Sequence, residues 1–212
     1  MNKPNAYDET QAGGEFTPVE LGGHKLVIKQ VNETKSKSKI INGVEYGLKD
    51  MLVVLFDFAD DDKQPGYFME QFQNDIRPDK KWPNQATQYI LTEDAEGKCT
   101  RNFKTFTTCV EHSNAGFSVQ WGDKFCQCFK GKKIGGVFGE QMDYYNGEEK
   151  KKRVLRWFCS LDKVADAAIP DMSETKAYKE YKQGGGMPNY GTPGDNGFMN
   201  IPDGINEELP FN

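Results

Sequence analysis

Residues 51–59, MLVVLFDFA, form an almost uninterrupted apolar run that is rich in β-branched and aromatic side chains. A run of this length and composition is typical of a strand buried on both faces. Turn-forming residues follow at once, from Asp60 to Gly66, and end the run. The sequence therefore predicts a central β-strand here, with Phe56 and Phe58 on the same face and both in the core.

Strands are also expected on either side of this run. Apolar and polar residues alternate over 24–31, HKLVIKQV, which predicts a strand before it. Residues 67–73 are expected to form a strand that pairs with the 51–59 strand in an antiparallel manner. In the long polar loop between the first two strands, Asn42 and Gly43 predict a tight turn that closes a small hairpin.

The second half of the chain is expected to mix helices and strands. Short helices are expected at 85–92, 103–113 and, from a cap at Ser173, 173–181. In the second of them Phe103, Phe106 and Val110 recur at helical spacing and face a core. Further strands are expected at 125–130, 132–141 and 151–161, with Asn146 and Gly147 in the hairpin turn before the last. Glycines mark bends or close backbone approach at Gly135, Gly136 and Gly139.

Several β-hairpins with one helix before the last pair predict a mainly β fold, a small closed or partly open barrel. The best match is the OB-fold, a five-stranded Greek-key barrel in the order three strands, helix, two strands, here with one or two short helices. We expect a flexible arm at 1–15, an OB-fold-like domain at 16–170, a short helix at 171–183 and a disordered acidic tail at 184–212.

Charge is unevenly distributed along the 212 residues. The chain carries 27 Lys and Arg against 32 Asp and Glu, a formal net charge of −5. Residues 98–163 nevertheless hold 13 basic and 7 acidic side chains, whereas 184–212 hold four acidic side chains and no Lys or Arg. Because local charge governs the attraction of phosphates, the negative total does not exclude binding to nucleic acid.

Single-stranded DNA is bound by cations spaced for phosphates and by aromatic faces that stack on bases. Both occur in residues 77–82 and 144–153, and three lysines lie between the first two strands. In an OB-fold, the loops between the first two and the last two strands flank the nucleic-acid groove. The candidate DNA-binding residues are Lys35, Lys37, Lys39, Arg77, Lys80, Lys81, Trp82, Tyr144, Tyr145, Lys150, Lys151, Lys152 and Arg153. A solvated hairpin end is the alternative for 150–153.

The three tryptophans are expected to differ in exposure. Trp82 follows a polar, basic stretch and is expected to be exposed. Trp121 and Trp157 each lie within an apolar β-pattern, so core packing is expected for both.

No segment resembles a signal peptide and no apolar run approaches the length of a membrane span, so a cytoplasmic location with reduced cysteines is expected. Cys109, His112, Cys126 and Cys128 could together form a structural zinc site, but their spacing is not that of the usual knuckle. Burial of the thiols as small apolar groups is the favoured alternative, and no cofactor is expected.

Motifs of known enzyme classes are mostly absent: there is no G-x-x-x-x-G-K-[ST], no G-x-S-x-G and no H-E-x-x-H. The chain is therefore not expected to be an enzyme. The stretch from Pro78 to Lys81 resembles a fragment of a metal-dependent nuclease site. A magnesium-dependent nuclease that uses Asp79 is thus kept as an alternative.

The last residues, Glu207, Glu208, Leu209, Pro210 and Phe211, combine acidic and apolar side chains. The tail that they end is rich in Gly, Pro and Asn, and its apolar residues are too scattered to bury one another. Such an end is suited to capture by basic, hydrophobic pockets on partner proteins. An ordinary frayed terminus is the alternative.

This ending resembles the acidic-Ile-Pro-Phe tip of bacterial and phage single-stranded DNA-binding proteins, although Leu209 replaces the Ile and Asn212 follows Phe211. The pattern of residues 15–165 is similar to a phage family found among replication and recombination genes. The resemblance implies an OB-fold, sequence-nonspecific binding of single-stranded DNA in a bacterial host cell, and recruitment of replication or recombination proteins by the tail. A homo-oligomer, and an interaction protein that acts through its tail without binding DNA, are left open.

Overall fold

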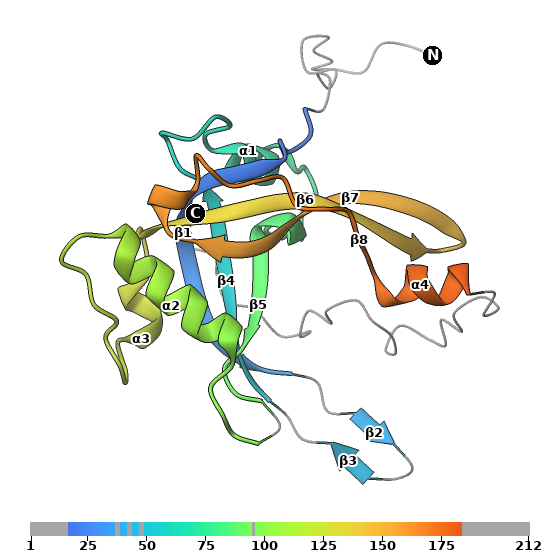
Figure 1. Cartoon of the computed structure of the whole chain (residues 1–212), viewed down its shortest axis with the longest axis horizontal. Helices are drawn as coiled ribbons and strands as arrows, with labels where there is room; N and C mark the ends of the chain where they lie inside the picture. The colour runs from blue at the N-terminus through green and yellow to red at the C-terminus, as the bar shows by residue number, and fades with distance from the viewer. Residues whose placement is uncertain (1–16, 37–38, 42–43, 47–48, 95, 184–212) are drawn as a thin grey trace.

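The computed structural model describes residues 17–36, 39–41, 44–46, 49–94 and 96–183 (Figure 1). The strands are β1 (Gly22–Lys35), β2 (Lys39–Ile41), β3 (Val44–Tyr46), β4 (Asp50–Phe58), β5 (Thr87–Leu91), β6 (Lys133–Tyr145), β7 (Glu148–Cys159) and β8 (Ser173–Glu174). The helices are α1 (Tyr67–Asn74), α2 (Arg101–Ser113), α3 (Phe125–Cys128) and α4 (Lys176–Lys182), with 3₁₀ turns η2 (Asn84–Ala86) and η3 (Leu161–Lys163). The fold is mainly β, as predicted.

One sheet holds six strands, in the order β5-β4-β1-β6-β7 with β8 paired to β6. The apolar run forms β4, which lies between β1 and β5 and is antiparallel to both. Phe56 and Phe58 are buried in the core, as predicted. The first strand is longer than expected, and its register with β4 shifts between Ile28 and Gln30.

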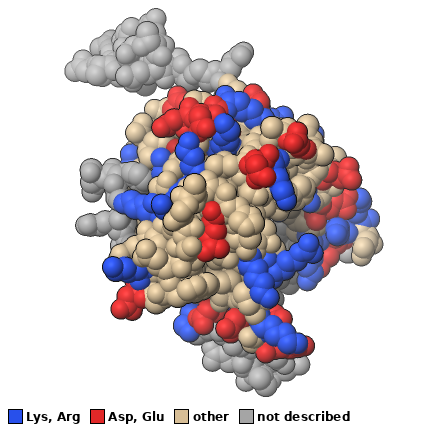
Figure 2. All heavy atoms as spheres, turned by 60° about the vertical axis from the view of Figure 1, so that its left-hand side comes forward, with Lys and Arg blue, Asp and Glu red and all other residues tan. Residues whose placement is uncertain are grey.

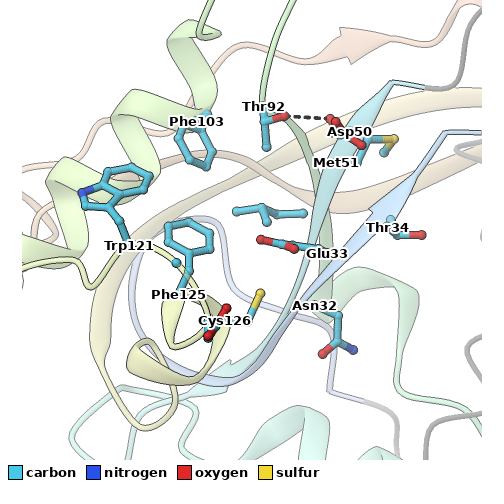
Figure 3. Close-up of a pocket in the computed structure, with 13 residues that line it drawn as sticks. Asn32, Glu33, Thr34, Asp50, Met51, Thr92, Phe103, Trp121, Phe125 and Cys126 are labelled. Carbon is cyan, nitrogen blue, oxygen red and sulfur yellow. Dashed lines mark hydrogen bonds between the residues drawn. The ribbon is translucent and has the colours of Figure 1, made fainter.

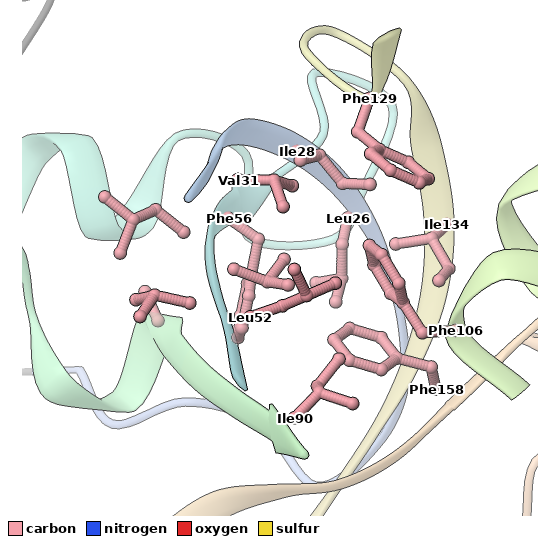
Figure 4. Close-up of a cluster of buried hydrophobic side chains, with 14 of the residues drawn as sticks. Leu26, Ile28, Val31, Leu52, Phe56, Ile90, Phe106, Phe129, Ile134 and Phe158 are labelled. Carbon is pink, nitrogen blue, oxygen red and sulfur yellow. The ribbon is translucent and has the colours of Figure 1, made fainter. Parts of the chain in front are cut away.

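Helix α2 closes the core from one side (Figure 4). Thr100 caps the helix by accepting a hydrogen bond from the Phe103 amide. The ring of Phe106 packs 5.4 Å from that of Phe158 in β7 and 5.1 Å from that of Phe129 after α3. The helical stripe that the sequence predicts is thus the face that α2 buries.

Two hairpins predicted from Asn-Gly pairs are present. Asn146 and Gly147 connect β6 and β7 with φ angles of 54° and 81°, the left-handed values that this type of turn requires. In the other hairpin Ile41 pairs with Val44. Residues 42–43 lie outside the described residues.

Two expected strands are helices. Residues 67–73 belong to α1, which buries Phe68 and Phe72 at a spacing of four residues. Residues 125–130, also expected to form a strand, begin with α3. Phe125 in this helix and Phe129 just after it are both buried and are again four residues apart. Short apolar runs fit either pattern, so the helical spacing was missed.

Two expectations about helices are also wrong. Residues 85–92 hold one 3₁₀ turn and then β5, because the backbone of Thr87–Leu91 pairs with β4. Ser173 lies in β8 and does not cap α4. The cap is Thr175, whose hydroxyl accepts from the amide of Tyr178.

Glycines on the outer face of β1 and β6 let the segment after β7 cross the sheet closely. A Cβ atom on Gly23 would lie 2.0 Å from the carbonyl oxygen of Val164, and one on Gly139 would lie 2.4 Å from Pro170 Cγ. Since real Cβ atoms do not approach so closely, only glycine fits at these positions. Gly139 is one of the positions at which a bend or close backbone approach is predicted, and its near neighbours are the side chains of Pro170 and Arg156.

The two outer edges of the sheet, β5 and β7, do not pair with each other in the described residues. Gln85, just before β5, donates a hydrogen bond of 2.9 Å from Nε2 to the carbonyl oxygen of Arg153 in β7. The sheet is therefore open in its strand pairing, and one side-chain bond spans the gap between its edges.

A buried histidine joins β1 to the turn after β4. His24 Nδ1 lies 2.9 Å from Asp62 Oδ1, and its ring stacks on Phe58 with 4.2 Å between centroids. Asp62 also accepts hydrogen bonds from the amides of Lys25 and Gln64. Burial raises the pKa of Asp62, but the hydrogen bonds from His24 and the two amides outweigh it, so the pKa is lowered.

The lowered pKa predicts how this contact depends on pH. The pKa of Asp in an unfolded chain is about 3.9. The contribution of Asp62 to stability is therefore present above this pH and is lost as the pH falls through the lower pKa of the folded state. In urea denaturation between pH 5 and pH 3, we expect the free energy of unfolding to fall less steeply in Asp62→Asn than in the wild type. Equal slopes would contradict this role for Asp62.

Candidate nucleic-acid interface

The tip of the β6–β7 hairpin presents an aromatic ring beside a cation. Tyr145 is 41% exposed, and Lys150 Nζ lies 5.5 Å from the centroid of its ring. Lys150 also lies 3.7 Å from a carboxylate oxygen of Glu148; the lysine side chain is partly exposed and the glutamate largely exposed. In Figure 1 this hairpin and the β2–β3 hairpin both extend toward the right-hand side of the view.

Tyr144, the other aromatic candidate on this hairpin, is buried. Its ring stacks on Tyr181 of α4, with 3.9 Å between centroids and 10° between planes. One face of Tyr144 is therefore covered by the protein itself. Tyr144 therefore does not present an exposed ring, whereas Tyr145 is partly exposed.

The basic residues after the turn lie on β7, in agreement with the strand expected from residue 151. The strand register places each opposite a residue of β6, and carboxylates there neutralise two of them. Lys151 Nζ lies 2.6 Å from Glu140, and Lys152 Nζ lies 2.6 Å from Asp143.

Asp143 is almost completely buried, which distinguishes the second of these pairs. Its carboxylate also accepts hydrogen bonds from the Thr175 hydroxyl and the Tyr144 amide. Burial raises the pKa of Asp143, but the bonds from Lys152 and Thr175 more than offset this, and the pKa is lowered. Asp143 thus joins the hairpin to the segment before α4 through Thr175, and Lys152 neutralises its charge.

Arg153 has a structural partner as well. Its Nη1 donates to the carbonyl oxygen of Val19 at 2.5 Å, and its own carbonyl accepts from Gln85. The side chain is half-buried. These bonds join β7 to the segments before β1 and before β5.

The stretch 77–82 contains exposed cations but not an exposed tryptophan. Arg77 forms a two-pronged ion pair with Asp75, which lowers the pKa of that carboxyl to about 2, and Lys80 Nζ lies 4.8 Å from the centroid of the Phe72 ring. Lys81 is exposed. The expectation that Trp82 is exposed is wrong: it is 6% exposed, and its indole donates to the carbonyl oxygen of Phe56.

The remaining candidates are only partly described. Lys35 ends β1 and pairs with Asp50 at 3.0 Å, with both side chains mostly exposed. Lys37 lies outside the described residues, and of Lys39 only the backbone, in β2, is described. The arm 1–15 and the residues expected to bind partners, Glu207, Glu208, Leu209, Pro210 and Phe211, also lie outside them.

Two tryptophans expected in the core are at the surface. Trp157, in β7, is 46% exposed, and Trp121, in the loop before α3, is 69% exposed. The apolar pattern around each residue predicts a buried ring, but both rings are exposed, and Trp82, which was expected at the surface, is buried. Gly122, with a φ angle of 86°, follows Trp121 and was a signal of a bend there.

The four proposed zinc ligands are not brought together. In the described ranges, no group of three or more His, Cys, Asp or Glu side chains is arranged to hold a metal ion. Cys126 and Cys128 lie on a helix and not on a strand. Burial raises the pKa of Cys109 and Cys126, which keeps these thiols protonated.

Basic and acidic side chains are interspersed on the face that carries α2 and α3 (Figure 2). No protein-family model matches the chain, and no curated protein matches it significantly. None of the helices in the described ranges has both the length and the apolar character needed to cross a membrane.

The two ion pairs on β7 predict different costs of truncation. Lys152→Ala leaves the buried carboxylate of Asp143 without its cation, so we expect a loss of about 1.5–3 kcal/mol in the free energy of unfolding. Lys151→Ala, the matched control, breaks a more exposed pair and should cost at most about 1 kcal/mol. Urea denaturation of both variants measures the difference, and equal losses would contradict a structural role for Lys152.

Proposed function

We propose that the protein binds single-stranded DNA with little sequence preference and acts in phage replication or recombination. The observation that carries the proposal is the hairpin tip, where the exposed ring of Tyr145 lies beside the Lys150 ammonium group. Stacking on an aromatic ring and attraction of phosphate by a neighbouring cation are the two interactions that nonspecific binding of single strands requires.

Ion pairing at the surface is compatible with this role. Exposed pairs such as Lys35–Asp50 and Lys150–Glu148 contribute at most about 1 kcal/mol, so a phosphate can replace the carboxylate at little cost. Binding to phosphates also releases counterions from the DNA. The residues that we propose for phosphate contacts are therefore the exposed ones, namely Lys35, Arg77, Lys80, Lys81, Lys150 and Lys151.

We further propose that the sheet is an OB-like barrel that is partly open. The chain order β1, β4, β5, α2, β6, β7 supports this, since the main helix comes between the third and fourth of five long strands. The bond from Gln85 to Arg153 also supports it, because it links the two edges that such a barrel brings together. In this arrangement the β1–β4 connection and the β6–β7 hairpin flank the DNA.

No observation favours the nuclease alternative. Asp79 is exposed in the loop after α1, between the cations Arg77 and Lys80. In the part of the chain that the structure describes, no set of three carboxylate, His or Cys side chains converges on it. A magnesium-dependent nuclease needs several such ligands around its metal.

Substitutions at the hairpin tip test DNA binding. Tyr145→Ala should weaken binding to oligo-dT by about 1–3 kcal/mol, because one base no longer has an aromatic ring to stack on. Lys150→Ala should reduce the slope of log K against log salt by about one. Lys98→Ala removes a more exposed lysine, which is paired with Glu96, and it should change neither quantity.

Fluorescence anisotropy at several salt concentrations gives both quantities. A wild-type protein that binds duplex and single strands equally, or whose affinity does not depend on salt, would contradict the proposal. The proposal would also be contradicted if Tyr145→Ala and Lys150→Ala were folded and bound oligo-dT like the wild type.

We propose that the acidic tail recruits replication or recombination proteins. The support is its sequence, in which Leu209 and Phe211 are apolar anchors beside Glu207 and Glu208. Deletion of residues 204–212 should leave affinity for oligo-dT unchanged or slightly higher, since a competing polyanion is removed. Capture of partner proteins from a host lysate should be lost. Much weaker DNA binding with capture retained would contradict this role.

A further inference from the structure

An open pocket of about 720 Å³ lies between the ends of β1 and β4 and the loop that leads into α3 (Figure 3). Phe103, Trp121 and Phe125 form its aromatic side. The ring of Trp121 stacks on Phe125, with 5.2 Å between centroids and 17° between planes. Because Trp121 is 69% exposed, the ring is held on one face by Phe125 and remains accessible from solvent.

The polar side of the pocket is acidic. Glu33, Asp50 and Asp123 line it, and in Figure 3 the Glu33 carboxylate points into the pocket. Asp50 is neutralised by Lys35, whereas within the described residues Glu33 and Asp123 make no ion pair. A phosphate would be repelled here, so the pocket does not suit the backbone of a nucleic acid.

An exposed indole and unpaired carboxylates in one pocket are the two groups that recognise a guanidinium. The face of tryptophan attracts a cation more strongly than any other aromatic side chain does. Arginine stacks its flat guanidinium on such a face and at the same time donates paired hydrogen bonds to a carboxylate. Lysine forms only a point contact and carries a tightly bound hydration shell, so it is the weaker ligand.

We propose that this pocket binds an arginine side chain presented by a basic segment of another protein. The guanidinium stacks on the exposed face of Trp121, and the carboxylates of Glu33 and Asp123 supply the negative potential that attracts it. The acidic residues 184–212 of this chain have the wrong charge for the site. The pocket adjoins one proposed phosphate contact, since Lys35 pairs with Asp50 of its lining, but neither Tyr145 nor Lys150 lines it.

NMR of protein labelled with ¹⁵N at its tryptophans tests this. The indole N–H signal of Trp121 is assigned from Trp121→Ala, which should fold normally because the side chain is mostly exposed. The probe is a short glycine–serine peptide that carries two arginines. We expect it to move the Trp121 signal in a saturable manner and to leave the signal of Trp157, the other exposed tryptophan, in place.

Three comparisons decide the outcome. The same peptide with glutamates in place of arginines should not move the Trp121 signal. Glu33→Gln should weaken binding of the arginine peptide about fivefold or more, whereas Glu96→Gln, at an exposed site outside the pocket, should not change it. The proposal is overturned if the arginine peptide leaves the Trp121 signal unmoved, if the glutamate peptide moves it equally, or if oligo-dT moves it instead.

Discussion

Burial of β4 on both faces is the constraint on which the rest of the structure depends. Every residue from Leu52 to Ala59 is buried, so both faces of the strand need a cover. The one charged residue among them, Asp57, accepts hydrogen bonds from the amides of Phe58 and Phe68. Burial raises its pKa despite these bonds. Helix α1 thus begins where Asp57 binds an amide of its first turn, and its position follows from that of β4.

The parts of the fold that were predictable from sequence are those whose signal is local. An almost continuous apolar run rich in β-branched residues, an Asn-Gly pair between strands and a helical stripe of three large side chains are each typical of one structure. The four-residue spacing from Phe68 to Phe72, and from Phe125 to Phe129, lies in segments too short to separate helix from strand. What makes α1 a helix includes the cap from Asp57, which sequence periodicity cannot reveal.

The candidate site was predictable in its residue types but not in their partners. The sequence identifies the lysines of β7 as candidates, but it does not reveal their partners. Lys150 lies opposite the buried Asp143 in the strand register, yet it is Lys152, two residues further along the strand, that binds this carboxylate. Exposure of aromatic rings also depends on distant segments. Trp82 is covered where its indole donates to the backbone of β4, whereas Trp121 lies in the loop before α3 with only one face packed, on Phe125.

The glycines under the segment after β7 have a consequence for the order in which the chain assembles. Gly23 belongs to β1 and Gly139 to β6, and these strands are far apart in the sequence. Val164 packs against Gly23 and Pro170 against Gly139, so the face of the sheet that they contact forms only when β1 and β6 have paired. Pairing between distant strands is slow, since a long loop must close first. We therefore expect this segment to dock after β1 and β6 have paired.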